Sequence, residues 1–430
     1  MLSLLNILYE YQLYIPNMIP MDKEQIVHAL ESTNSWWYGK FDLEFRDRTI
    51  YAKIKRFMPE RQIIALTGLR RTGKTMLMFK FVKDYLADIE KTNIIYFSFD
   101  DFRDLKLRTV LHEYSRIRNK DLESGKYIFF FDEIQKVDGW DEQLKALYDA
   151  YPNIKFIISG SESLFIRKKS KESLAGRMYE FQIKTLSFKE YLGFRNLEYR
   201  NNSLSRNTLQ MELSKFFVCN GFPEIIGKDA DIAEKYLKEN VIDRIIYRDI
   251  PQILPIKEPA ILDQLFKIIL SGPGEIININ SIANDLGISR QTASLYIDYL
   301  ERSFLIRKLY NFSKNARKTQ RRSKKYYPAI ISPGLLGNSE LFGKIFETFA
   351  VNESDAEFFW RDAYKREVDI VKTNPLIAIE IKSGRIKDTK NLETFIKKFG
   401  PSKSIIISYE IEETRGSVNV IPFYKYLLDA

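Results

Sequence analysis

The chain has 430 residues, of which 45% are hydrophobic, 14% aromatic and 29% charged. This length exceeds one ordinary domain of about 100–200 residues and the apolar content is sufficient to build cores, which excludes a single small module and a wholly disordered chain. One cysteine and two histidines exclude an internal disulfide framework and leave little for a zinc site.

The net charge of +10 is concentrated in one segment. Residues 302–325 contain ten basic residues and no acidic residue, whereas the rest of the chain has equal numbers of both. A local basic surface of this kind indicates a polyanionic partner. The apolar residues 1–20 include Glu10 and lack a basic start and a cleavage site, and no other run is long enough to span a bilayer. We therefore expect a cytoplasmic protein without a membrane partner.

The apolar runs of the first two hundred residues alternate with helical stretches. Continuous β-rich runs separated by helices are typical of a parallel sheet that is covered on both faces. Four such runs are expected as strands, at residues 62–67, 93–98, 127–131 and 155–159. The sequence therefore predicts an N-terminal extension and helix over residues 1–44, followed by an α/β domain over residues 45–200.

A glycine-rich segment joins the first of these strands to an amphipathic helix at residues 76–89. Residues 68–75 match the pattern GxxxxGK[ST], in which backbone N–H groups and a helix N-terminus surround phosphate. Lys74 is expected to reach the β- and γ-phosphates, and the Thr75 hydroxyl to hold Mg²⁺. ATP and Mg²⁺ are therefore the predicted cofactors. The residues assigned to nucleotide binding are Gly68, Leu69, Arg70, Arg71, Thr72, Gly73, Lys74, Thr75 and Met76.

Two carboxylates end the apolar run 127–131. Ligands of parallel sheets bind outside the carboxyl ends of the strands, which is where Asp132 and Glu133 would emerge. Asp132 is placed to contribute to the nucleotide site and to hold the Mg²⁺, and Glu133 to polarise the attacking water. After a phosphate-binding loop, this acid pair indicates nucleotide hydrolysis.

Further polar residues follow the next expected strand. Ser159 and Ser161 are placed to sense the γ-phosphate, although a helix cap is an equal alternative for serines in such a turn. Arg177 follows a glycine turn and is either a catalytic arginine finger or a surface ion pair. As a finger it would act within its own chain or on a second copy in a homo-oligomer.

These motifs, together with residues 185–192 (Thr-Leu-Ser-Phe-Lys-Glu-Tyr-Leu) and 220–224 (Asn-Gly-Phe-Pro-Glu), resemble the AAA+-type ATPases of archaea and bacteria that carry a C-terminal domain of unknown function. The resemblance covers about residues 45–430. It implies ATP hydrolysis by Lys74, Thr75, Asp132 and Glu133. It also implies an α/β P-loop NTPase fold of AAA+ type, followed by a helical lid at 201–255, a winged helix with a basic wing at 256–332 and a restriction-endonuclease-like α/β domain at 333–430.

A helix, a tight turn and a second helix are expected over residues 280–300. Ser289 would cap the second helix, whose first exposed residues suit phosphates and base edges. Two strand-like runs at 304–310 and 324–331 then flank a basic connection, as in a winged helix with a long wing that binds DNA with strong salt dependence. A protein-interaction or lid element is the alternative. The DNA-binding candidates are Arg290, Gln291, Ser294, Lys314, Arg317, Lys318, Arg321, Arg322, Lys324 and Lys325.

The last region contains an acid-lysine pattern. Glu347 lies on a helix that begins near residue 341, and Asp369 precedes a turn into the strand that carries Glu380 and Lys382. Residues two apart in a strand share one face, so the pattern resembles the PD-(D/E)xK nucleases, in which carboxylates hold Mg²⁺ and the lysine activates water. The same fold also serves as an inert binding or assembly module.

The sequence as a whole predicts a Mg²⁺-dependent ATPase that couples ATP to the binding or processing of DNA. The alternative is a signalling or assembly switch, in which ATP rearranges the winged helix against a protein partner and the C-terminal fold is inert. Stimulation of ATP turnover by DNA separates the two.

Overall fold

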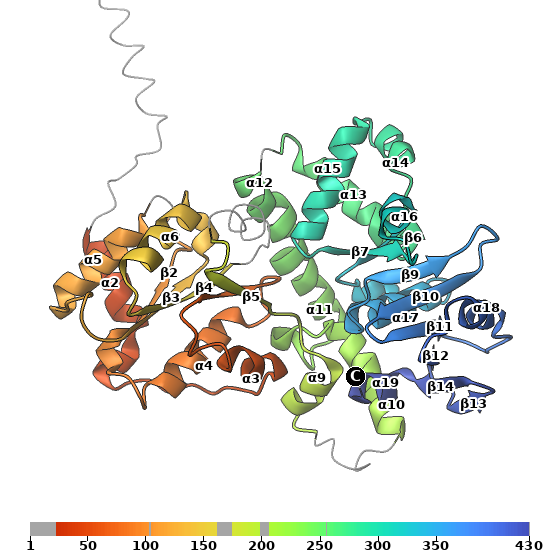
Figure 1. The fold of residues 1–430 in the computed structure, drawn as a ribbon, viewed down its shortest axis with the longest axis horizontal. Coiled ribbons are helices and arrows are strands. Elements are labelled where there is room, and N and C mark those ends of the chain that lie inside the picture. Colours follow the sequence, from red (N-terminus) through yellow and green to blue (C-terminus); the bar gives the residue numbers. More distant parts are fainter. Residues whose placement is uncertain (1–22, 103–104, 161–173, 198–205, 255, 430) are drawn as a thin grey trace, which may run out of the picture.

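The computed structural model describes residues 23–102, 105–160, 174–197, 206–254 and 256–429. The side chains at 253, 316, 320 and 321 lie outside this description. Two sheets of different construction organise the chain, with a helical segment between them (Figure 1).

The first domain is built on a parallel sheet of five strands. Its order is β2 (Ile94–Ser98), β3 (Tyr127–Asp132), β4 (Ile154–Ser159), β1 (Ile63–Thr67) and β5 (Met178–Gln182). All neighbouring pairs are parallel, and β1 and β3 are buried along their whole length. The four predicted strands and the α/β fold are confirmed, and β5 is an addition that the sequence analysis did not predict.

Helices cover both faces of this sheet, with α3 and α4 on one side and α6 on the other (Figure 1). The apolar faces of these helices and the buried strands form one core. The helical elements are α2 (Lys23–Thr33), η1 (Ser35–Tyr38), α3 (Thr49–Lys55), α4 (Lys74–Tyr85), η2 (Lys91–Asn93), α5 (Leu107–Arg118), η3 (Ile134–Lys136) and α6 (Trp140–Ala150).

The N-terminal segment closes the exposed edge of β2. The Asn34 side chain donates to the Tyr96 carbonyl at 2.9 Å and accepts from the Tyr96 N–H at 2.7 Å. The indole N–H groups of Trp36 and Trp37 both donate to the Ile94 carbonyl, each at 2.9 Å. An unpaired edge strand can pair with another chain, so these side chains take the place of a sixth strand.

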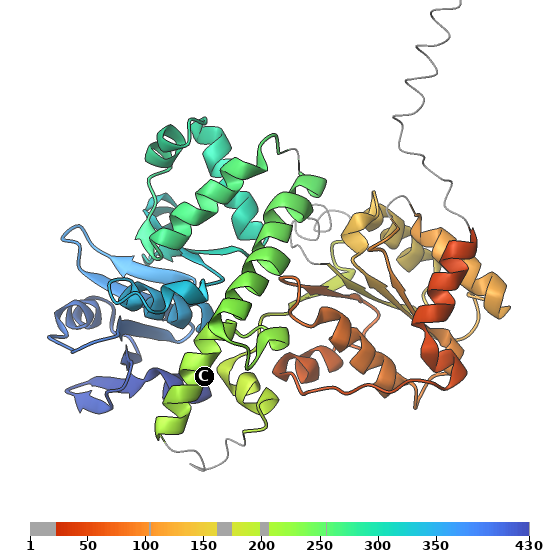
Figure 2. The same cartoon turned by 180° about the vertical axis from the view of Figure 1, so that it is seen from behind.

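A helical segment connects the two sheets, and Figure 2 shows it between them. Its elements are α9 (Phe188–Phe194), α10 (Arg206–Cys219), η4 (Pro223–Ile225), α11 (Ala230–Tyr236), η5 (Leu237–Ile242), η6 (Ile245–Asp249) and α12 (Ile250–Ile253). The sequence predicts a break at Pro251, but the helical path continues through it. The π-helical turns η5 and η6 precede this proline, and such turns are the local adjustment by which helices accommodate irregular backbone.

The second sheet has nine strands and mixed directions. Its order is β13 (Glu413–Arg415), β14 (Val418–Pro422), β12 (Lys403–Ser408), β11 (Leu376–Lys382), β10 (Glu367–Thr373), β9 (Phe358–Arg361), β7 (Ile306–Asn311), β8 (Lys324–Pro328) and β6 (Glu275–Ile276). The strands of the predicted winged helix and those of the predicted C-terminal domain therefore form one continuous sheet. β7 and β9 join them through a parallel pairing of Tyr310 with Phe358 and Asn311 with Phe359.

Helices flank this sheet on both faces. They are α13 (Pro259–Ser271), α14 (Ile279–Asp285), α15 (Arg290–Arg302), α16 (Ala316–Arg321), η7 (Pro333–Leu335), α17 (Phe342–Glu353), α18 (Lys390–Phe399) and α19 (Phe423–Asp429). The residues of α17 and α19 share one hydrophobic core with the connecting helical segment, and α18 covers a separate core on the other face. Leu69 of the phosphate-binding loop packs into the first of these cores. Within the described residues, no helix has the length and apolar character needed to cross a membrane.

Candidate active site

The glycine-rich segment forms a tight loop between β1 and α4. Gly68 has a φ of +138°, and a Cβ at this position would overlap the carbonyl oxygen of Ile183. Ile183 is held in place because its N–H donates to the Thr67 carbonyl at 2.6 Å. Gly73, with a φ of +92°, is the residue before α4. The loop therefore needs glycine where the backbone turns and where it touches the segment after β5.

Lys74 lies inside this loop. Its ammonium donates to the carbonyls of Leu69 at 2.8 Å and Gly68 at 3.2 Å, and the residue is buried. Burial lowers the pKa of Lys74, while the nearby carboxylates of Glu133 and Asp132 oppose that shift. The loop therefore encloses a buried ammonium at the position where phosphate oxygens are expected.

Three hydroxyl groups donate hydrogen bonds to the Asp132 carboxylate at the end of β3. The Thr75 hydroxyl donates to its Oδ2 at 2.6 Å, and the Tyr96 hydroxyl donates to the same oxygen at 2.8 Å. The Ser159 hydroxyl donates to Oδ1. Strand order explains the gathering, because β4 lies between β1 and β3 and all three end at the same edge. No motif marks Tyr96; the available signal was its place on β2, the strand next to β3 in the parallel sheet.

Glu133 follows in a left-handed conformation, with a φ of +54°. The Gln135 side chain donates to Oε2 of Glu133 at 2.6 Å. The backbone N–H of Glu133 donates to the Ser159 hydroxyl at 3.3 Å. Burial raises the pKa of Glu133, the Lys74 ammonium opposes the rise, and the Asp132 charge adds to it. A carboxylate with a raised pKa is better able to take a proton from water near neutral pH.

These residues fit Mg²⁺ and ATP. A hydroxyl and a carboxylate, from Thr75 and Asp132, lie side by side, and a buried ammonium lies within a loop of backbone N–H groups at a helix N-terminus. When bound, Mg²⁺ supplies charge stabilisation to the phosphate oxygens. Thr75 and Asp132 would hold it, Lys74 would contact phosphate, and Glu133 would orient and deprotonate water.

The two arginines of the loop contact the connecting helical segment. Arg70 forms an ion pair with Asp249 of η6 at 2.5 Å, and Arg71 lies 3.2 Å from Glu224 of η4. The Tyr236 hydroxyl also donates to Glu224, at 2.8 Å. Sequence reasoning assigned both arginines to the nucleotide alone and missed their acidic partners, because no motif marks them.

Arg48 fastens the loop from the other side. Its guanidinium donates to the carbonyls of Thr72 and Lys184, each at 2.8 Å, and Nε lies 3.2 Å from Oε1 of Glu190. Both charged side chains are buried, with exposed fractions of 6%. Ser187 and Glu190 form a capping box at the start of α9. Through its ion pair with Glu190, Arg48 therefore links the phosphate-binding loop to the first helix of the connecting segment.

We expect Arg48→Met to lower the free energy of unfolding of the first domain by about 3–5 kcal/mol, because the Glu190 carboxylate would be left buried without its cation. Arg177→Met is the matched control: its partner Asp149 is half exposed, so the change should stay within about 1 kcal/mol. Denaturant unfolding of the full chain measures both. Equal effects would contradict the role given to Arg48.

Arg177 is far from the phosphate-binding loop. It precedes β5, its carbonyl accepts from the Ile63 N–H at the start of β1, and its guanidinium pairs with Asp149 of α6 at 3.0 Å. The loop follows the opposite end of β1, at a distance of roughly 16 Å for a five-residue strand. An arginine finger within the same chain is therefore wrong, and the surface ion pair is what the fold contains. A role across an interface stays a prediction.

Ser161 and Met76, the last two residues predicted to bind nucleotide, lie away from the contacts described above or outside the described residues. Ser161 lies outside the described residues. Met76 is exposed on the first turn of α4.

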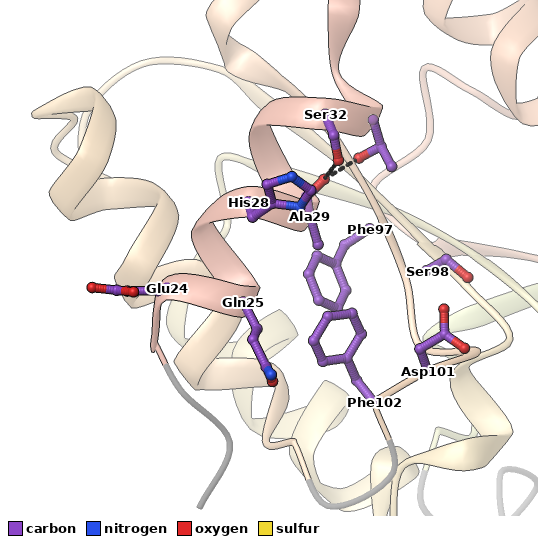
Figure 3. Close-up of a pocket in the computed structure, with 10 residues that line it drawn as sticks. Glu24, Gln25, His28, Ala29, Ser32, Phe97, Ser98, Asp101 and Phe102 are labelled. Carbon is purple, nitrogen blue, oxygen red and sulfur yellow. Dashed lines mark hydrogen bonds between the residues drawn. The ribbon is translucent and has the colours of Figure 1, made fainter.

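A pocket elsewhere in the first domain is lined by α2 and the end of β2, with His28, Ser32, Phe97, Asp101 and Phe102 among its residues (Figure 3). None of its lining residues belongs to the predicted site.

The predicted DNA-binding residues occupy two places. Arg290, Gln291 and Ser294 are exposed on the first turns of α15, which Ser289 caps by accepting from the Thr292 N–H. Lys314, Arg317 and Lys318 are exposed on and before α16, and Lys324 is half-buried. Arg322 donates to the Phe312 carbonyl at 3.1 Å, and the Arg321 side chain lies outside the described residues.

Lys325 was predicted to face DNA, and this is wrong. The residue is buried, and its ammonium lies 2.5 Å from Oε1 of Glu367 and 3.1 Å from Oε1 of Glu347. Burial lowers the pKa of Lys325, but the charges of Glu347, Asp369 and Glu367 outweigh it and raise the pKa above its ordinary value. The sequence placed it in a basic run, but the alternation of β8 turns its side chain inward.

The acid-lysine pattern of the last region is spread over three elements. Glu347 lies on α17, and Asp369 on β10 accepts from the Ile381 N–H at 2.7 Å. Burial and the Glu347 charge raise the pKa of Asp369 well above its ordinary value. On β11, Lys382 pairs with Glu380 at 2.8 Å, and Oε2 of Glu380 is buried without a hydrogen-bond partner.

These residues do not fit a divalent metal ion. The described residues contain no group of three or more Asp, Glu, His or Cys side chains that could hold one. Glu380 faces Lys382, and Glu347 faces Lys325 and the hydroxyl of Tyr327. The lone oxygen of Glu380 is a single ligand, whereas Mg²⁺ requires a nearly octahedral set. The predicted metal ligands Glu347, Asp369 and Glu380 and the catalytic Lys382 are therefore not assembled as a metal site.

Comparison with known proteins assigns the three parts of the chain. Residues 60–192 match an AAA domain. Residues 210–337 and 342–426 match two domains of unknown function, DUF8612 and DUF4143. The chain is 30% identical over 377 residues to the uncharacterized protein MJ1544 of Methanocaldococcus jannaschii, which covers 86% of this chain and 79% of that protein. The chain belongs to the MJ1544 family.

Other relatives of this MJ1544-family chain are also uncharacterized. MJ1637 of the same organism is 27% identical over 91% of the chain and 90% of its own length, and a Haemophilus influenzae protein is 29% identical over 64% and 68%. The ORC2 protein of Aeropyrum pernix and CDC6P of Pyrobaculum aerophilum, both 12% identical, cover 74% of the chain and 98% of their own, with TM-scores of 0.38 and 0.31. Such low TM-scores carry no argument about function. The AAA domain makes this chain an AAA-type P-loop ATPase.

Proposed function

We propose that this AAA-type ATPase couples ATP hydrolysis to the binding of DNA. One observation carries the proposal: the two arginines of the phosphate-binding loop form ion pairs with the helical segment that leads into the basic part of the chain. Arg70 contacts Asp249 and Arg71 contacts Glu224. Phosphates entering the loop would compete with these carboxylates for the guanidinium groups, so nucleotide occupancy would alter the hold of the loop on the helix.

Hydrolysis itself is assigned to the end of β3. Glu133 would deprotonate the attacking water, and the Gln135 side chain would hold the Glu133 carboxylate in orientation. Lys74 would stabilise the charge that develops on the phosphate. Asp132 and Thr75 would hold the Mg²⁺. The hydroxyls of Tyr96 and Ser159 would fix the Asp132 carboxylate by donating to both of its oxygens.

A winged helix is proposed for residues 256–332. Its support is the order of elements, which runs α13, β6, α14, α15, β7, α16 and β8, with β7, β8 and β6 paired antiparallel. The second helix of the pair, α15, presents Arg290 and Gln291 at its exposed N-terminal turn, as a recognition helix does. The connection between β7 and β8 would be the wing, and it carries exposed basic residues.

The DNA surface extends beyond the wing. β7 and β9 are parallel, so the wing after β7 and the hairpin after β9 leave the sheet at the same end. The Asn311 side chain holds the two together by donating to the Arg361 carbonyl at 3.0 Å. At the hairpin tip Tyr364 is 81% exposed, with the Arg366 guanidinium 5.2 Å from its ring. An exposed ring beside basic groups suits stacking on a nucleic-acid base.

We expect neutralisation of Lys314, Arg317 and Lys318 to glutamine to weaken DNA binding and reduce its salt dependence. Each lost phosphate contact should lower the slope of log K against log salt by about 0.9. Fluorescence anisotropy with duplex DNA at several salt concentrations measures the slope, and ATP turnover with and without DNA measures the coupling.

The matched control removes the same charge from the exposed Lys91, Lys126 and Lys189 of other surfaces, and it should leave the slope as it is in the parent. If the parent does not bind DNA at low salt and its turnover ignores DNA, the proposal fails.

A second candidate function is an ATP-driven switch that acts on a protein partner. The observation that favours it is Leu295, which is 43% exposed on α15 one turn after Gln291. An exposed apolar side chain on this helix suits a protein surface better than phosphates. Under this candidate, the C-terminal fold is inert and DNA leaves ATP turnover unchanged.

A further inference from the structure

We infer that the ammonium of Lys325 occupies the cation position of the C-terminal acidic cluster, so that this site is neutralised by a lysine from β8 and takes up no divalent metal. The cluster consists of Glu347 on α17, Glu367 and Asp369 on β10, and the Tyr327 hydroxyl on β8. The inference goes beyond the proposed ATPase and DNA-binding functions and does not depend on them.

The contacts of the ammonium define the position. Lys325 Nζ lies 2.5 Å from Oε1 of Glu367 and 3.1 Å from Oε1 of Glu347, so it bridges carboxylates from a helix and from a strand. The same Glu347 oxygen accepts from the Tyr327 hydroxyl at 2.6 Å. A metal ion that linked Glu347 and Glu367 would have to displace this ammonium.

The backbone of Lys325 cannot move aside easily. It belongs to the middle strand of the three-stranded part of the sheet, where Lys325 is paired with Ile276 on one side and Leu309 on the other. Phe359 and Tyr327 also lie beside the ammonium, which is 5.5 Å and 5.9 Å from the two ring centroids. The lysine is therefore a fixed part of the fold.

The arrangement also explains how two regions of the chain are joined. Lys325 comes from the proposed winged helix, whereas Glu347 and Glu367 come from the C-terminal region that matches DUF4143. The exposed fractions of the paired side chains, 6% for the lysine and 20% and 22% for its partners, indicate strong attraction with little solvent screening. The acidic cluster therefore serves as an ionic contact between the two regions.

The test is a Mn²⁺ titration of the nucleotide-free full chain, followed by electron paramagnetic resonance. The parent should show no Mn²⁺ site that depends on Asp369. Lys325→Met removes the ammonium that bridges Glu347 and Glu367, leaving Glu367 its 3.6 Å contact with Arg361, and should gain one Mn²⁺ site that the parent lacks and that Lys325→Met/Asp369→Asn loses again. Lys325→Arg keeps the positive charge and should gain none.

If Lys325→Met does not fold by circular dichroism, Mn²⁺ should restore its folding or raise its Tm by about 5 °C, because a metal that binds only the folded state stabilises it. Two results would overturn the inference: a Mn²⁺ site in the parent that disappears in Asp369→Asn, or Lys325→Met that neither binds Mn²⁺ nor is rescued by it.

Discussion

Glu133→Gln is expected to lower the rate of ATP hydrolysis by at least about 100-fold and to leave ATP binding nearly unchanged. General base catalysis is worth roughly 10²–10⁴ in rate, and glutamine keeps the shape and hydrogen bonding of the side chain but cannot accept a proton from water. The contacts of Lys74, Thr75 and Asp132 do not involve the Glu133 carboxylate. Single-turnover hydrolysis and equilibrium nucleotide binding separate the two effects.

The raised pKa of Glu133 predicts how the rate of ATP hydrolysis depends on pH. Because burial raises the pKa of Glu133 above the ordinary value of 4.5, the ionised base is lost at a higher pH than for an exposed glutamate. The acid side of the rate profile should therefore fall off above pH 4.5, and the profile of Glu133→Gln should lack this limb.

The control is Glu142→Gln, an exposed glutamate on the first turn of α6, which should hydrolyse ATP like the parent. Lys74→Ala should differ from both, since it removes the ammonium that would contact phosphate and should abolish nucleotide binding. Hydrolysis by Glu133→Gln at the parent rate would place the base elsewhere.

The nucleotide site was predictable because its chemistry depends on short, local patterns. Buried strands of a parallel sheet are continuous apolar runs, and Gly68, Lys74 and Asp132 stand at fixed distances along the chain from two of them. The parallel order of the sheet then brings the two segments to one edge. Strand β5 is not predicted because it is only half-buried and its residues, Met178–Gln182, do not form a continuous apolar run.

The contacts between regions were not predictable. Arg70 finds Asp249, and Arg48 finds Glu190, across more than a hundred residues of chain, and no spacing rule connects them. Lys325 shows the same limit: charge counting placed it with its basic neighbours, although its side chain is buried against Glu367. A count of charge along the sequence describes a segment, whereas the direction of each side chain depends on the register of its strand.

The C-terminal region was predicted in part for a related reason. The apolar runs at 357–360, 368–371, 376–382 and 403–408 predict four strands, which correspond to β9, β10, β11 and β12, and α17 begins one residue from its expected start. Helices α18 and α19 and the short hairpin of β13 and β14 were not expected. Nor was the pairing of β7 with β9, which makes one sheet of two predicted domains: strand pairing between distant segments leaves no local signal.

Gly68→Ala is expected to destabilise the first domain by about 3 kcal/mol or more and to abolish ATP binding. An alanine would need the φ of +138° that only glycine adopts readily, and its Cβ would overlap the Ile183 carbonyl oxygen. Relief requires the loop or the segment after β5 to move, but the Ile183 N–H is bonded to Thr67 at 2.6 Å, so the loop would shift away from its phosphate-binding shape.

Gly139→Ala separates the collision from the cost of positive φ. Gly139 has a φ of +62° and no atom within 4 Å of the position of a Cβ, so this variant should lose only about 1 kcal/mol and bind ATP like the parent. Denaturant unfolding and nucleotide titration measure both variants. If Gly68→Ala behaved like Gly139→Ala in both measurements, close approach of the backbone at Ile183 would not be what makes glycine necessary in this loop.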